Sequence, residues 1–143
     1  VIGFGSAIVL LILLDLTAYL AGYPLTPDFV LDTMRQARDQ GLIWLVLLGL
    51  CVAAPITEEF IFRGFIFRGW SESFLRPVGA ITLSAALFAI IHLQYLWFYV
   101  AGIFLVGLLF GYLRHRSGST WLTVAIHAFF NLMAGLQGLW MIR

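Results

Sequence analysis

The stretch LIWLVLLGLCVAAPITEEFIFRGFIF, residues 42–67, is apolar enough to cross a membrane, yet it carries two acidic residues and one basic residue. A helix needs about 20 mostly apolar residues to cross a bilayer core of roughly 30 Å, and this stretch exceeds that length. An ionised side chain near the bilayer centre costs about 2.5–3.5 kcal/mol even on mild insertion scales. Glu58, Glu59 and Arg63 therefore need either mutual compensation or a water-filled pocket.

The whole chain has the composition of a membrane protein. Of its 143 residues 62% are hydrophobic and only 10% are charged, and the mean hydropathy is +1.01. A soluble domain of this size carries more charge because its surface must be hydrated. The formal net charge of +1 provides no basic surface for nucleic acid. The single cysteine, Cys51, excludes an intramolecular disulfide.

Hydropathy predicts an all-α, polytopic membrane protein with about five transmembrane helices, at 1–20, 42–67, 78–92, 96–113 and 121–140. One domain, residues 1–143, is expected, with a trimmed N-terminus because the chain begins without an initiator Met. The segment TPDFVLDTMRQARDQG (26–41) predicts an amphipathic helix with Thr26 as its cap. This helix would lie at the membrane interface or be a solvated surface helix.

The two ends of the predicted bundle differ in charge. Four arginines occupy the short loops at one end, whereas the arginines at the other end are diluted by three aspartates. The positive-inside rule then places the arginine-rich end in the cytoplasm of a cell membrane, either inner or plasma membrane. In the fourth predicted span Gly107 and Gly111 form a Gly-x-x-x-Gly pair, which predicts close helix packing within the chain or against a second copy.

The three charges in the second span have unequal partners. On an α-helix Glu59 and Arg63 are four residues apart with the glutamate first, which is the favourable order for an ion pair. Glu58 is rotated about 100° from Glu59 and roughly 140° from Arg63, so it does not easily share that partner. We therefore expect Glu59 and Arg63 to be supporting residues and Glu58 to be available for chemistry. Pro55 cannot donate to the Cys51 carbonyl, which predicts a kink or a freed acceptor nearby.

Two further spans carry polar side chains that are able to meet Glu58. His92 closes the third predicted span one turn after Phe88, and HAFFN places His127 and Asn131 on one face of the last span. Counted from the arginine-rich end, Glu58 and His127 lie roughly 13 and 12 Å deep, whereas His92 lies roughly 21 Å deep. Each of these residues alone fits a packing role. Four unpaired polar groups on three helices are costly, however, unless they converge.

A convergent glutamate, two histidines and an asparagine provide the groups for amide hydrolysis by an activated water. Glu58 would take a proton from a water that a neutral His92 orients. His127 and Asn131 would donate hydrogen bonds to the oxyanion. Glu58, His92 and His127 are also able to hold Zn²⁺ with water in the open position, although the sequence lacks the H-E-x-x-H pair that favours a metal. The expected cofactor is therefore either none or Zn²⁺.

The order of these motifs resembles the CPBP intramembrane proteases. This family, also called ABI, includes CAAX prenyl endopeptidases and proteins linked to bacteriocin processing and self-immunity. The motifs are EExxxR at 58–63, FxxxH at 88–92 and HxxxN at 127–131, and the resemblance covers about residues 42–137.

The resemblance implies an all-helical core whose catalytic cavity opens towards the cytosolic leaflet. It implies that Glu58 and His92 activate water and that His127 and Asn131 form the oxyanion site. The supporting residues would be Glu59, Arg63 and Phe88. The family has been described both as metal-dependent and as a glutamate type, so the resemblance leaves the cofactor open.

We therefore expect a CAAX-type intramembrane endopeptidase that acts near the cytosolic face. Its partners would be the lipid bilayer and a peptide or membrane-protein substrate, with prenylated and leader-bearing substrates among the candidates. Two other functions use the same residues. A non-catalytic immunity or peptide-binding protein would use the polar cavity for recognition alone. A b-type cytochrome would use His92 and His127 as axial haem ligands, although the adjacent charges make poor surroundings for haem.

Overall fold

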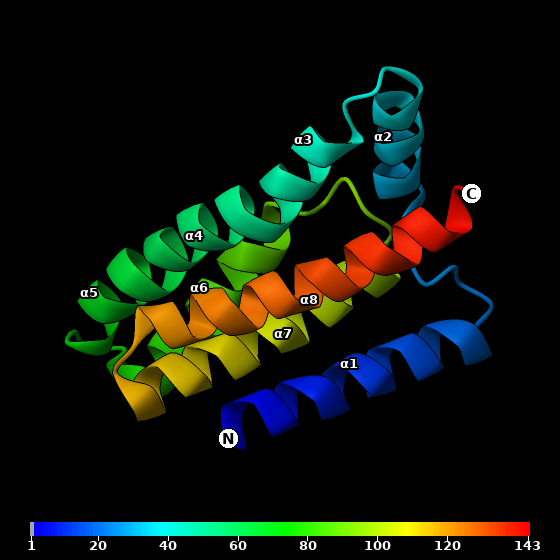
Figure 1. Cartoon of the computed structure of the whole chain (residues 1–143). Helices are drawn as coiled ribbons and strands as arrows, with labels where there is room; N and C mark the ends of the chain where they lie inside the picture. Colours follow the sequence, from blue (N-terminus) through cyan, green and yellow to red (C-terminus); the bar gives the residue numbers. More distant parts are fainter. Residues whose placement is uncertain (1) are drawn as a thin grey trace.

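All regular structure in the computed structural model, which describes residues 2–143, is helical (Figure 1). Helix α1 (Ile2–Leu20) leads through a loop to the short helix α2 (Asp28–Asp39), and a continuous helical rod then runs from Ile43 to Ser71. Three more helices complete the chain, namely α6 (Arg76–Ile90), α7 (Trp97–Ser117) and α8 (Thr120–Met141). The predicted all-α, polytopic fold class is confirmed.

The helical rod alternates between two kinds of hydrogen bonding. Its segments are α3 (Ile43–Leu48), η1 (Gly49–Ala53), α4 (Ala54–Glu59), η2 (Phe60–Ile66) and α5 (Phe67–Ser71), where η marks a π-helix. A π-helix pairs each carbonyl with the N–H five residues on, and such segments are rare and frequent at functional sites. The sequence predicts one membrane-spanning helix here, with a kink or a freed acceptor near Pro55 but no π-helical segments. The π-segments flank α4, which carries both glutamates.

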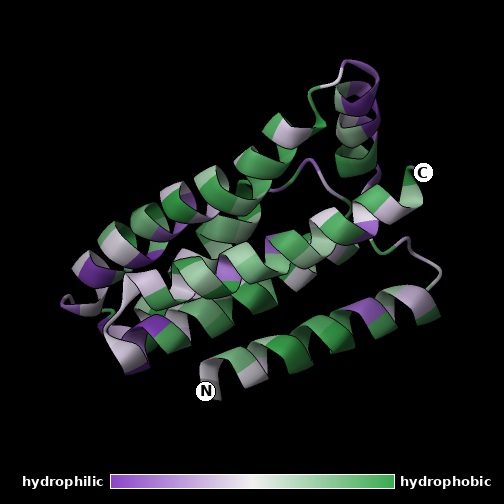
Figure 2. Ribbon diagram, viewed as in Figure 1, coloured by the Kyte–Doolittle hydropathy of each residue, from purple (hydrophilic) through white to green (hydrophobic). Residues whose placement is uncertain are grey.

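Four helices are long and apolar enough to cross a membrane, and Figure 2 shows the hydrophobic residues that cover them. These candidate spans are Gly3–Leu20, Ile43–Ser71, Trp97–Ser117 and Thr120–Met141. The remaining predicted span, 78–92, differs from expectation. Its helix, α6, has 15 residues and a length of roughly 22 Å, which is short of a bilayer core. Because α6 ends at Ile90, His92 lies in the turn that follows.

Helix α2 is amphipathic, as predicted. Its buried residues, Leu31 and Met34, pack with Ile142 at the end of α8, while its aspartates and arginines are exposed or partly exposed. The helix begins at Asp28 with Pro27 in the cap position and no side-chain cap, so the prediction that Thr26 caps it is wrong. Thr26 is instead fully buried.

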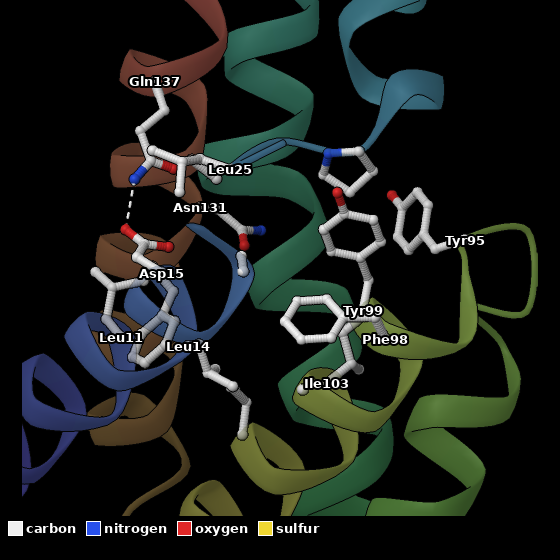
Figure 3. A pocket seen from close by; sticks show the side chains of 16 residues that line it. Leu11, Leu14, Asp15, Leu25, Tyr95, Phe98, Tyr99, Ile103, Asn131 and Gln137 are labelled. Carbon is white, nitrogen blue, oxygen red and sulfur yellow. Dashed lines mark hydrogen bonds between the residues drawn. The ribbon is translucent and has the colours of Figure 1, made fainter. Parts of the chain in front are cut away.

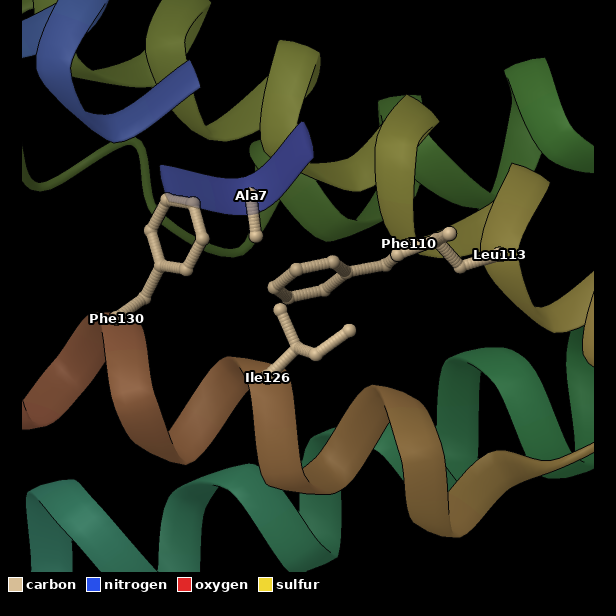
Figure 4. Packing of buried hydrophobic residues seen from close by; sticks show 5 residues of the cluster. All are labelled: Ala7, Phe110, Leu113, Ile126 and Phe130. Atoms are coloured by element: carbon tan, nitrogen blue, oxygen red, sulfur yellow. The ribbon is translucent and has the colours of Figure 1, made fainter. Parts of the chain in front are cut away.

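Two close packings hold the bundle around the rod. A buried apolar cluster joins α1 to α7 and α8 (Figure 4), and it consists of Ala7, Phe110, Leu113, Ile126 and Phe130. Helices α6 and α7 meet at Gly107, where an added Cβ would lie 3.0 Å from the Cβ of Ala85, and at Gly111, where it would lie 3.1 Å from Ile81. The Gly-x-x-x-Gly prediction is thus confirmed, and this face packs within the chain.

Candidate active site

A pocket of about 370 Å³ lies between the rod, α6, α7 and α8. Its lining includes Glu58, His92, His127 and Asn131. The four side chains come from segments far apart in the sequence, and the structure brings all of them to one cavity. The matching depths predicted for Glu58 and His127 agree with the 3.8 Å between Glu58 Oε2 and His127 Nε2. His92, for which the sequence predicts a greater depth, lines the same pocket.

Behind the pocket, Glu59 and Arg63 form a fully buried ion pair with 2.9 Å between Oε1 and Nη1. The guanidinium also donates to the Gly107 carbonyl at 3.0 Å and lies over the Phe88 ring, with Cζ 4.6 Å from the ring centroid. The predicted pairing of Glu59 with Arg63 is therefore confirmed. Because the guanidinium is enclosed by these partners, Glu58 is left outside the ion pair.

His127 lies between the two glutamates. Its Nδ1 is 3.0 Å from Glu59 Oε1, and its Nε2 is 3.8 Å from Glu58 Oε2. Glu59 Oε1 already accepts a hydrogen bond from Arg63, so it is the acceptor here and His127 Nδ1 donates a hydrogen bond to it. Nε2 therefore faces the pocket and Glu58. The contact with Glu59 was not foreseen, because it joins residues 68 positions apart.

His92 is held by the backbone of the helix that precedes it. Its Nδ1 lies 2.8 Å from the carbonyl of Phe88, and a carbonyl only accepts, so Nδ1 carries a proton and donates. In the neutral ring Nε2 is then an acceptor. The ring of Phe88 also packs edge-on against His127, with 5.8 Å between centroids. Phe88 thus contacts both histidines and Arg63, which is the arrangement that its predicted supporting role requires.

Asn131 donates from Nδ2 to the Leu50 carbonyl at 2.8 Å. The sequence predicted a freed acceptor at Cys51, and the π-helix η1 explains the shift by one residue. The Ala54 N–H bonds to the Gly49 carbonyl, five residues back. In the same pattern the Leu50 carbonyl would accept from the N–H of Pro55. Proline has none. The Leu50 carbonyl therefore accepts from Asn131, which keeps its second amide proton and its Oδ1.

Two further residues of the pocket were missed by the functional prediction. Thr26 is fully buried and lines the pocket, and its hydroxyl has no hydrogen-bond partner within residues 2–143. Tyr95, in the loop between α6 and α7, also lines it. Burial raises the pKa of the Tyr95 phenol, and the nearby Glu58 charge acts in the same direction. Tyr95 therefore stays a neutral hydrogen-bond donor.

Glu58, His92 and His127 are the residues that would hold Zn²⁺ in a metal-dependent version of the site. Within residues 2–143, no three His, Cys, Asp or Glu side chains lie close enough together to hold a metal ion. His127 by itself has the orientation common in metal-ligating histidines, with Nδ1 on a carboxylate and Nε2 facing Glu58, so what the described residues lack is a third ligand close enough to both. As positioned, the three predicted ligands do not fit a shared ion.

The pocket extends towards the α2 end of the bundle. Its lining runs from Glu58 and His127 to Thr26, Pro27 and Gln94, which lie in loops at that end. The turns between α5 and α6 and between α7 and α8, where the arginine-rich loops lie, are at the opposite end (Figure 1). The two expectations for orientation thus disagree, because the charge rule and a cavity open to the cytosol place opposite ends in the cytoplasm.

The sequence matches the family described as type II CAAX prenyl endopeptidase Rce1-like over residues 40–133. This match covers about two thirds of the chain and includes all three motifs. The chain therefore belongs to this family, and its class is that of a CAAX-type intramembrane protease. Neither a curated protein nor a solved structure matches the chain.

Proposed function

We propose that the chain is an intramembrane endopeptidase in which Glu58 and His92 activate a water that hydrolyses a peptide bond. The observation that carries the proposal is the convergence of Glu58, His92, His127 and Asn131 on one pocket. The side-chain exposure of Glu58 is 22%, whereas that of Glu59 is 0%, so Glu58 is the carboxylate that a water is able to reach.

This mechanism needs no covalent intermediate, and Glu58 returns to its starting state at the end of each turnover. Glu58 accepts a proton from the water as the water oxygen bonds to the carbonyl carbon. His92 orients the water by accepting its other hydrogen at Nε2. His127 Nε2 and the second amide proton of Asn131 donate to the resulting oxyanion. Glu58 then gives its proton to the amide nitrogen as the C–N bond breaks, which releases an amine and a carboxyl group.

The charges around His127 support its role as a donor. The carboxyl groups of Glu58 and Glu59 lie on the two sides of the imidazole, and Arg63 pairs with Glu59. Acidic groups on both sides suit a ring that donates from Nδ1 to Glu59 and, in the proposed mechanism, from Nε2 into the pocket, where the oxyanion forms.

The test is turnover by a Glu58→Gln variant in proteoliposomes, with CAAX-type peptides and a membrane-protein substrate. We expect a loss of about 10²–10⁴-fold, the usual effect of removing a general base. The matched control is Glu72→Gln, which removes an exposed glutamate near the end of the same rod and is expected to keep wild-type turnover. Wild-type turnover by Glu58→Gln would contradict the mechanism. Tight peptide binding without turnover by the wild-type chain would favour the immunity or peptide-binding function.

We further propose that the α2 end of the bundle faces the cytoplasm, so that the pocket opens to the cytosolic leaflet. The course of the pocket towards Thr26 and Gln94 and the family's cytosolic activity support this orientation over the arginine count. An Arg35→Cys variant in a Cys51→Ser background carries its single cysteine on α2. This cysteine should react with a membrane-impermeant maleimide in inside-out vesicles. Reaction in right-side-out vesicles instead would reverse the orientation.

A further inference from the structure

A second cavity of about 190 Å³ adjoins the catalytic pocket, and we name it the side pocket (Figure 3). Its walls come from α1, α7, α8 and the loops that precede α2 and α7. Tyr95, Ile103, Val106 and Asn131 line both cavities. A peptide whose scissile bond lies at Glu58 is therefore able to extend a neighbouring side chain into the side pocket.

The side pocket contains one acidic side chain and, among the described residues, no basic one. The acid is Asp15 on α1, whose Oδ2 accepts a hydrogen bond from Gln137 Nε2 on α8 at 2.7 Å (Figure 3). Gln137 is neutral, so this bond does not balance the charge. A carboxylate on a membrane-spanning helix is costly and marks a functional site by default.

The other polar groups of the side pocket are also arranged as acceptors. Asn131 uses Nδ2 on the Leu50 carbonyl, and Gln137 uses Nε2 on Asp15, so each retains a carbonyl oxygen. Together with Asp15 Oδ1, these oxygens form a wall suited to a hydrogen-bond donor. Asp15 lies roughly 8 Å from the end of α1, near the membrane interface.

An aromatic wall faces the acidic wall across the side pocket. Figure 3 shows Tyr95, Phe98 and Tyr99 on the side opposite Asp15 and Gln137. The Tyr99 hydroxyl donates to the Pro24 carbonyl at 2.7 Å, which fixes that ring. Aromatic faces attract cations, and Leu11, Leu14 and Ile103 supply apolar surface between the walls.

We propose that the side pocket binds a basic side chain, lysine or arginine, of the peptide substrate. Its aliphatic stem lies along the apolar residues, and its cationic end lies between Asp15 and the aromatic wall. Asp15 is thus a specificity-determining residue. This inference rests on the proposed peptidase function, because the catalytic pocket fixes where the peptide backbone runs.

A purely structural role for Asp15, as a link between α1 and α8, predicts different behaviour in two variants. Asp15→Asn removes the charge and keeps an oxygen for Gln137. Gln137→Leu removes the link and keeps the charge. A specificity residue is sensitive to the first change, and a structural link to the second.

The experiment measures binding of fluorescent peptides to the full chain in nanodiscs, in a Glu58→Gln background so that no peptide is consumed. The peptides carry lysine, arginine or norleucine at each position near the scissile bond. At one position we expect the basic peptides to bind about ten- to hundredfold tighter than the norleucine peptide, the range for a hydrogen bond to a charged group. Asp15→Asn should reduce this ratio to about one, whereas Gln137→Leu, which removes one neutral acceptor and keeps the charge, should leave a ratio well above one.

The matched control is Asp39→Asn, which removes an exposed carboxylate on α2 and should leave the ratio unchanged. The inference would be overturned if the chain with Asp15 bound basic and norleucine peptides equally well. It would also be overturned if the preference for basic peptides were lost in Gln137→Leu and kept in Asp15→Asn. The same peptides are then offered to the chain with Glu58 intact. An Asp15-dependent binding preference without any cleavage would contradict the proposed function and leave the binding site standing.

Discussion

The polar residues on the two sides of the pocket wall differ in how they are bonded. Behind the wall, Glu59 and Arg63 are fully buried and are joined to each other, to His127 and to the Gly107 carbonyl. At the pocket surface, Glu58 is partly exposed, and neither Glu58 nor His92 Nε2 has a hydrogen-bond partner within the described residues. The neighbouring glutamates thus differ in their surroundings: Glu59 is buried in an ion pair, and Glu58 is open to the pocket, as the proposed mechanism requires.

The largest expected effect comes from breaking the buried side. Arg63→Met leaves the Glu59 carboxylate buried without its cation, which costs about 3–5 kcal/mol for a buried pair that loses one partner. The measurement is thermal unfolding in detergent. Arg68→Met, which removes an exposed arginine five residues further along the rod, should change stability by less than about 0.5 kcal/mol. Equal melting temperatures for the two variants would show that the buried pair does not stabilise the fold.

A smaller loss is expected where α6 meets α7. Gly107→Ala places a Cβ 3.0 Å from the Cβ of Ala85, and such overpacking costs about 1–3 kcal/mol. Displacement of α7 would also move the carbonyl that accepts from Arg63. The control is Gly5→Ala, where an added Cβ meets nothing within 4 Å. The double change Gly107→Ala with Ala85→Gly should recover little, because the added Cβ still lies 3.1 Å from the Cα of residue 85. A Gly107→Ala protein that melts at the temperature of Gly5→Ala would contradict the packing explanation.

A moderate effect, confined to substrate binding, is expected from a substitution at the pocket surface. Thr26→Val keeps the side-chain shape and removes the buried hydroxyl, which lines the pocket without a partner within residues 2–143. If this hydroxyl bonds to the peptide, KM should rise about three- to tenfold with little change in kcat, since one hydrogen bond contributes about 1 kcal/mol. Thr33→Val on the exposed side of α2 is the control. An unchanged KM would exclude Thr26 from substrate binding.

The smallest effect is expected from chelation. Because Glu58, His92 and His127 do not come together as three ligands, EDTA or phenanthroline treatment should leave turnover within about twofold of the untreated protein. Metal content is measured on the same sample. Activity that falls on chelation and returns with Zn²⁺ would show that these residues rearrange to bind a metal.

Local features of this fold were predictable from the sequence, and contacts between distant segments were not. The Glu59–Arg63 pair and the close packing at Gly107 follow from spacing along one helix. The hydrogen bond from His127 to Glu59 and the one from Gln137 to Asp15 join residues 68 and 122 positions apart, so they depend on how the helices pack.

The backbone of the rod also limited the prediction of the site. Pro55 indicated a freed carbonyl, but the π-helical register, which the sequence pattern does not reveal, moved it from Cys51 to Leu50. The residue type of Thr26 predicts a helix cap, because threonine favours that position. The helix starts instead after Pro27, and this leaves the threonine in the pocket.

The most direct test of the central claim compares Glu58→Gln with Glu59→Gln in one preparation, with both the melting temperature and the peptide turnover measured. The account predicts that Glu58→Gln melts close to wild type and loses turnover by about 10²–10⁴-fold. Glu59→Gln should lower the melting temperature, because Arg63 then lacks its buried carboxylate. A Glu58→Gln protein that turns over substrate at the wild-type rate would contradict the account.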